Sequence, residues 1–198
     1  MSPSQINMLL SIIFSLLIGG AYSIGYVSYD VVGKCKEIKY DDTFDFSTIP
    51  KVQYLSSYAD VPLTEYLDGI VLTSVPDDSL NFSYKGTADV HTFDGKRVSS
   101  DYQSVVLNPG SLLERHTDDG VDKSYYMIML GEVSQCKAYV YYRCSFQGTN
   151  PLDVVNVLKN DREPLTEECL ARINEITSGR GLNLVPSRIL PYKLHNYD

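Results

Sequence analysis

Residues 125–144 constrain the fold more than any other part of this chain. Two apolar, aromatic runs at residues 125–130 and 138–144 are separated by a short polar connector at residues 131–137. Tyr, Val, Ile and Met in runs of this length favour strands, and the connector favours a hairpin turn. Because both runs are apolar on both faces, each strand is expected to have a core or cavity on one side and another element on the other.

The rest of the chain predicts six further strands and one late helix. The helix is predicted from residue 164, with Thr166 or Leu165 near its cap, acidic residues in its first turn and Gly179 at its stop. Residues 182–198 are predicted to be extended. Eight short strands with turn residues between them predict a mainly β chain, folded as an antiparallel barrel or a sandwich. The further strands are expected at residues 51–58, 66–75, 81–91, 98–107, 111–116 and 152–158.

Residues 1–23 have the pattern of a secretory signal peptide. An apolar run at residues 8–18 is followed by small residues that include Ala21 and Ser23, as at a signal cleavage site. The run is short for a membrane span, which needs about 20 residues. We therefore expect residues 24–198 to form one secreted, extracellular domain with no stable membrane span after cleavage. An uncleaved anchor is the alternative.

Secretion would place the four cysteines in an oxidising compartment. Cys35, Cys136, Cys144 and Cys169 form an even set, and an oxidising compartment favours two disulfides among them. Three pairings are compatible with the residues alone. No Cys-x-x-Cys occurs and no His lies at zinc-finger spacing from a Cys, so no metal site and no cofactor are expected.

Charge and motifs exclude several classes of function. The chain has 17 basic and 25 acidic residues, a formal charge of −8, which argues against nucleic-acid binding. It contains no Gly-x-Ser-x-Gly, phosphate-binding glycine loop or His-Glu-x-x-His, and an enzyme is not expected. His91, His116 and His195 are scattered and are interpreted as solvated or structural. Asn81 begins a glycosylation sequon, Asn81-Phe82-Ser83.

Several short motifs, in their order along the chain, resemble those of the lipocalins. They are Gly33-Lys34-Cys35, Thr43-Phe44-Asp45-Phe46, the hairpin ending in Tyr142-Arg143-Cys144, and the helix with its exit at residues 164–181. The resemblance is strongest to apolipoprotein D and the arthropod lipocalins, with features similar to the tick histamine-binding proteins. The family's Gly-x-Trp would fall at residues 51–53 and is absent, and residues 159–162 give no clear match to the Arg that lies across that Trp.

The resemblance implies an eight-stranded antiparallel up-and-down β-barrel with one C-terminal α-helix packed outside. It also ranks the cysteine pairings, implying Cys35 with Cys144 and Cys136 with Cys169. Finally, it implies which strand residues face the interior and would contact a ligand. These are Gln53, Leu55 and Ser57 on the first strand, and Tyr125, Met127, Met129, Tyr139 and Tyr141 on the hairpin.

The inward residues suit a small amphipathic molecule, because Met adapts to irregular apolar shapes and Tyr hydroxyls can bind a polar end. The expected function is that of a carrier or scavenger of a hydrophobic or amphipathic ligand, such as a fatty acid, sterol, pigment, eicosanoid or amine. An amine needs an inward carboxylate, for which Glu65, Glu114 and Glu132 are candidates. The alternatives are a barrel filled by its own side chains and a protein-interaction or inhibitor module that acts through its loops.

Overall fold

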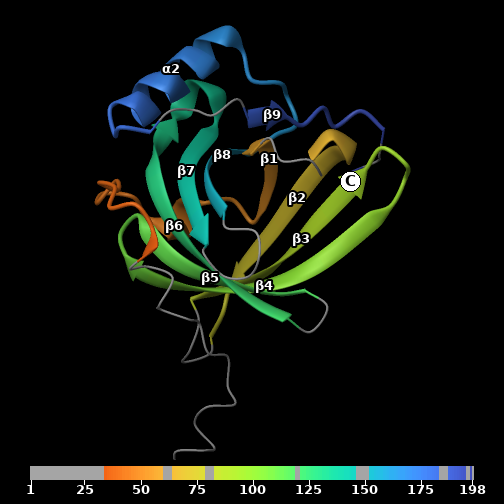
Figure 1. Ribbon diagram of the computed structural model, residues 1–198, viewed down its shortest axis with the longest axis horizontal. Helices are drawn as coiled ribbons and strands as arrows, with labels where there is room; N and C mark the ends of the chain where they lie inside the picture. Colours follow the sequence, from red (N-terminus) through yellow and green to blue (C-terminus); the bar gives the residue numbers. More distant parts are fainter. Residues whose placement is uncertain are drawn as a thin grey trace, which may run out of the picture.

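The computed structural model describes residues 34–59, 64–78, 83–118, 121–145, 152–182, 187–194 and 197. Residues 1–23, with the predicted signal peptide, lie outside the described residues, as do Asn81 of the sequon and His195. Figure 1 shows a barrel of strands with the helix α2 (Glu167–Ser178) packed against its outside.

The predicted antiparallel up-and-down barrel is confirmed. Strands pair in sequence order from β2 to β8, and β1 pairs with both β8 and β2, which closes the barrel. Every pairing is antiparallel, so short connections suffice between neighbours. The strands are β1 (Val52–Ala59), β2 (Leu67–Pro76), β3 (Tyr84–Thr92), β4 (Arg97–Asn108), β5 (Ser111–Asp118), β6 (Val121–Val133), β7 (Ala138–Ser145) and β8 (Leu152–Lys159).

The central hairpin differs from its prediction in the length of its first strand. β6 extends through Gly131 to Val133, residues assigned to the connector from their polarity. A β-bulge between Met129 and Gly131 allows the strand to continue, and only a 3-10 turn, Ser134–Cys136, connects it to β7. Lys137 closes this turn in the left-handed conformation, with φ 51°.

Alternation divides the hairpin's side chains between two cores. One set faces the barrel interior with Leu55 and Leu158, and the other faces the helix side. Both faces are buried, as the two apolar runs predicted. The inward set is Met127, Met129, Tyr139 and Tyr141, and the outward set is Ile128, Leu130, Val140, Tyr142 and Cys144.

The helix α2 (Glu167–Ser178) covers the outward set. The Thr166 side chain accepts a hydrogen bond from the Cys169 amide, and Glu167 and Glu168 lie in the first turn, where the helix dipole favours acids. Ile173, fully buried, is the centre of its contact with the barrel. Gly179 caps the helix end, as predicted.

Two disulfides cross-link this side of the molecule. Cys35 bonds to Cys144 of β7, and Cys136, after β6, bonds to Cys169 of α2. This is the pairing that the lipocalin resemblance implied. The first bond joins residues 109 apart in the sequence, so it ties the N-terminal segment to the end of the hairpin.

One end of the barrel is plugged by the segment before β1. Asp45 caps the 3-10 turn Phe46–Thr48 by accepting a hydrogen bond from the Ser47 amide. The Phe44 and Phe46 rings meet edge to face, and Phe44 also contacts Tyr139 inside the barrel. We call this the plug end; it also holds the β2–β3, β4–β5 and β6–β7 turns.

The C-terminal tail completes the wall where β1 and β2 separate. Direct β1–β2 pairing covers only Val52, Gln53 and Tyr54 of β1. Beyond it a ninth strand, β9 (Ser187–Ile189), pairs with β1, within a region predicted only to be extended. The Tyr192 hydroxyl then lies 2.9 Å from the Leu55 carbonyl oxygen and 2.7 Å from that of Ile70, bridging the two strands.

An aromatic–arginine contact exists near the position where the sequence showed none. The Arg162 guanidinium lies 5.8 Å from the centre of the Tyr54 ring and 5.9 Å from that of Tyr197. Such distances allow a cation–π attraction. Residues 159–162 gave no clear match to the family's Arg, and here Arg162 lies over Tyr54, one residue beyond the position expected for the Trp.

Candidate functional site

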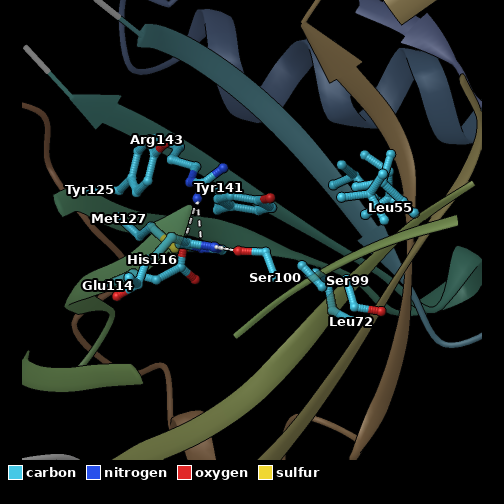
Figure 2. Close-up of a pocket in the computed structure, with 15 residues that line it drawn as sticks. Leu55, Leu72, Ser99, Ser100, Glu114, His116, Tyr125, Met127, Tyr141 and Arg143 are labelled. Carbon is cyan, nitrogen blue, oxygen red and sulfur yellow. Dashed lines mark hydrogen bonds and ion pairs between the residues drawn. The ribbon is translucent and has the colours of Figure 1, made fainter. Parts of the chain in front are cut away.

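The barrel encloses a cavity of about 380 Å³ between the middle of the strands and the end opposite the plug. This size is within the range of small-molecule sites. Figure 2 shows a polar group of side chains on one wall and the apolar Leu55 and Leu72 on the facing wall. We call this the upper cavity.

A second cavity of about 240 Å³, the lower cavity, lies toward the plug end. Its walls are mostly apolar and include Phe46, Ile49 and Leu158. The two cavities share three lining residues, Leu72, Glu114 and Met127, and are therefore adjacent along the barrel. A ligand that passes this junction would place its two ends in chemically different surroundings.

Three polar side chains form the centre of the upper cavity's wall. Glu114 and His116, two residues apart on β5, share an inward face, and Arg143 reaches them from β7 across β6. Arg143 Nη2 lies 2.6 Å from Glu114 Oε1, and His116 Nε2 lies 2.8 Å from the same oxygen. His116 Nδ1 lies 3.3 Å from Ser100 Oγ on β4. Figure 2 draws these contacts as dashed lines.

The carboxyl group of Glu114 stays ionised in this cluster. Burial raises its pKa, but electrostatic attraction to Arg143 and His116 and the hydrogen bonds from both side chains outweigh burial and lower the pKa to about 2. His116 Nε2 is also 3.1 Å from Arg143 Nη2. Arg143 and His116 therefore hold the same carboxylate oxygen of Glu114, and the three side chains form one hydrogen-bonded cluster.

Aromatic rings hold the cluster in place. The Arg143 guanidinium lies 3.8 Å from the centre of the Tyr125 ring, a cation–π contact. Tyr102 stacks on His116, with 5.4 Å between ring centres. The Tyr102 ring crosses Gly86 of β3, where a Cβ would lie 2.7 Å from Tyr102 Cζ, and its hydroxyl donates to the Thr73 carbonyl oxygen. Only glycine at residue 86 leaves room for this ring.

The structure brings most of the residues predicted for the interior to the two cavities. Tyr139 faces the interior but packs on Phe44 rather than lining either cavity. The upper cavity is lined by Leu55, Tyr125, Met127 and Tyr141, and the lower cavity by Gln53, Met127 and Met129.

Ser57 is the exception. A β-bulge between Leu55 and Ser57 shifts the register of β1, so that Ser57 lies opposite Val157 and Ile189. Val157 belongs to the core under the helix, and Ile189 is exposed. The prediction of an inward Ser57 is therefore wrong, because alternation carried past an unrecognised bulge gives the opposite face.

Sequence reasoning did not identify Arg143 and His116 as site residues. The signal was present, because Arg143 continues the inward series Tyr139, Tyr141, and His116 continues Leu112, Glu114. Of the three carboxylates considered for an amine, Glu65 and Glu132 are exposed and only Glu114 faces inward. Within the described residues, no group of His, Cys, Asp and Glu could hold a metal ion.

Comparisons with known proteins bear on the fold. No protein-family model and no curated protein matches the sequence. Among solved structures, the major allergen Per a 4 from cockroaches matches with a TM-score of 0.54 and 12% identity, covering 78% of this chain and 93% of that one. The siderocalin Ex-FABP matches with a TM-score of 0.49 and 9% identity, covering 73% and 94%.

The closed eight-stranded barrel with one helix after its last strand is the lipocalin fold, as the resemblance implied. In the described part of the chain, none of the helices is long and apolar enough to span a membrane. The two disulfides are of a kind that forms and persists in oxidising compartments.

Proposed function

We propose that this protein is a secreted carrier or scavenger that binds one small amphipathic molecule inside its barrel, and that it is not an enzyme. The adjoining cavities of about 380 and 240 Å³ are the observation that supports this proposal. The ligand's apolar part occupies the lower cavity, against Ile49, Met129 and Leu158. Its polar part lies at Glu114 and His116 in the upper cavity.

Apolar burial supplies most of the affinity in this proposal, and the polar cluster sets the orientation. Met127, on the wall of both cavities, is the residue that every ligand long enough to enter both must contact. Its flexible thioether tolerates different apolar shapes. Tyr125 and Tyr141 add hydroxyl groups to the upper wall.

Titration with N-phenyl-1-naphthylamine, a neutral probe that fluoresces in apolar sites, tests the proposal. We expect saturable binding to the wild type and its loss in Met127→Trp, because the larger ring fills the junction of the cavities. Glu132→Trp, on the exposed end of the same strand, is the control and retains binding. Equal probe binding by wild type and Met127→Trp would contradict the proposal.

A protein-interaction module is the second candidate, favoured by apolar side chains at the end opposite the plug. Tyr66 is 59% exposed, Phe93 41% and Val98 59%, and the Phe93 amide donates to the Tyr66 carbonyl oxygen. Exposed apolar groups that adjoin one another can mark a docking surface. If the wild type shows no saturable probe binding and Tyr66→Ser loses partner binding, this candidate is favoured.

A further inference from the structure

The upper cavity contains an ion pair whose hydrogen bonding is incomplete. Arg143 Nη2 and His116 Nε2 both approach the same carboxylate oxygen of Glu114, Oε1. The other oxygen, Oε2, accepts no hydrogen bond from any described residue. Glu114 is only 9% exposed and lines both cavities. An ionised carboxylate oxygen of a residue that borders a cavity requires a donor from water or a ligand.

The charge around this oxygen is already balanced. Glu114 and Arg143 carry opposite charges, 2.6 Å apart at their nearest atoms, and cancel each other. The only other charged side chain on the cavity walls formed by described residues is Lys51, which is exposed to solvent at the plug end. A charged ligand group beside the pair would therefore be an uncompensated charge inside the barrel.

The lower cavity also contains a polar side chain without a hydrogen-bond partner among the described residues, and this one is neutral. Gln53 is 5% exposed, lines the cavity and makes no hydrogen bond with a described residue through its carboxamide. An amide can donate to or accept from a neutral polar atom of a ligand. Both unsatisfied groups can thus be satisfied without adding charge.

From this arrangement we infer that the Glu114–Arg143 pair selects uncharged ligands that present a hydroxyl or N–H group to Glu114 Oε2. The inference rests on the proposed function and narrows its ligand class. Alcohols are favoured over both carboxylates and amines of the same skeleton. A ligand carboxylate is repelled by the unengaged oxygen of Glu114, and a ligand ammonium group is repelled by the guanidinium of Arg143.

Removal of one member of the pair should change which ligand charge is accepted. Glu114→Gln leaves Arg143 without its counter-charge and makes the site cationic, so it should favour carboxylates. Arg143→Met leaves Glu114 unbalanced and should favour amines. The double variant Glu114→Gln/Arg143→Met is neutral again and should disfavour both charged ligands.

Isothermal titration of dodecanol, dodecanoate and dodecylamine at mildly alkaline pH tests the inference. For the wild type we expect dodecanol to bind tightest, by at least about tenfold over each charged analogue. Glu114→Gln should strengthen dodecanoate binding, and Arg143→Met dodecylamine binding, each by about tenfold or more relative to dodecanol. Circular dichroism checks that each variant is folded.

If a single variant does not fold, the wild-type order and the double variant still decide the question. Tightest wild-type binding of dodecanoate or dodecylamine would overturn the inference, and so would a double variant that favours a charged analogue. If no dodecyl ligand binds but N-phenyl-1-naphthylamine binding still depends on Met127, the inference fails while the proposed function stands. Failure of both would remove the proposed function as well.

Discussion

The two faces of the β6–β7 hairpin consist of alternate residues of the same strands, yet they have different roles. The outward face packs against α2 with no exposure at Leu130, Val140 and Ile173, and both disulfides attach to this hairpin. The inward face lines two cavities. Alternation in a strand buried on both sides therefore separates residues that stabilise the fold from residues available to a ligand.

The largest expected effect belongs to the Cys35–Cys144 disulfide on the outward side. Replacing both cysteines by Ser should lower the free energy of unfolding by about 2–5 kcal/mol, because the bond closes a long loop in the unfolded chain. Urea denaturation measures this change. Probe affinity, measured where the variant is still folded, should remain close to that of the wild type; a large loss of affinity at retained fold would contradict the division of roles.

A matched pair of truncations on β6 compares the two faces directly. Leu130→Ala, on the outward face, should cost about 3 kcal/mol of unfolding free energy, since it leaves a void in a closely packed core. Met127→Ala, beside existing space, should cost only about 1 kcal/mol. Denaturation and probe titration should rank the variants in opposite orders, and the same ranking in both would refute the comparison.

Lowering the pH should reduce the free energy of unfolding, because Glu114 on the inward face becomes protonated. Its pKa is about 2 in the folded protein, against an ordinary value of 4.5, so the ionised form contributes stability above 4.5 that is lost as pH falls toward 2. We expect a loss of about 2 kcal/mol over this range. The double variant Glu114→Gln/Arg143→Met should have a flatter stability profile there. Parallel profiles for both proteins would show that Glu114 does not contribute.

The smallest expected effect is at the start of α2. Thr166→Ala removes the hydroxyl that accepts from the Cys169 amide and should cost about 1 kcal/mol. Thr166→Ser retains the hydroxyl and should be nearly neutral by thermal or chemical denaturation. Probe affinity should not change in either variant, because the helix contacts only the outward face.

The strands and the burial of the hairpin on both faces were predictable from local periodicity, whereas the choice of a barrel and of the inward residues came from the lipocalin resemblance. The β6 bulge did not affect the predicted inward residues of that strand, because it falls after Met129, the last of them. The β1 bulge falls before Ser57 and reversed its face. Bulges leave little trace in a single sequence, so predictions of facing fail beyond them.

The polar cluster and the tail depended on contacts that a single sequence does not reveal. Glu114 meets Arg143 only because β5, β6 and β7 pair in a particular register, with Tyr125 opposite Glu114 and Met127 opposite Arg143. The pairing of β9 with β1 joins segments more than a hundred residues apart, and the sequence predicted only an extended tail at residues 182–198. Both features depend on register and long-range pairing rather than on residue type.

A crystal structure of the protein with dodecanol tests the ligand role of the inward face most directly. We expect one ligand inside the barrel, with its hydroxyl within hydrogen-bond distance of Glu114 Oε2 and its chain passing Met127 toward Met129. Residues of the outward face should not move. Dodecanol bound only outside the barrel, or a barrel left without it at saturating concentration, would contradict the assignment of the inward face to ligand binding.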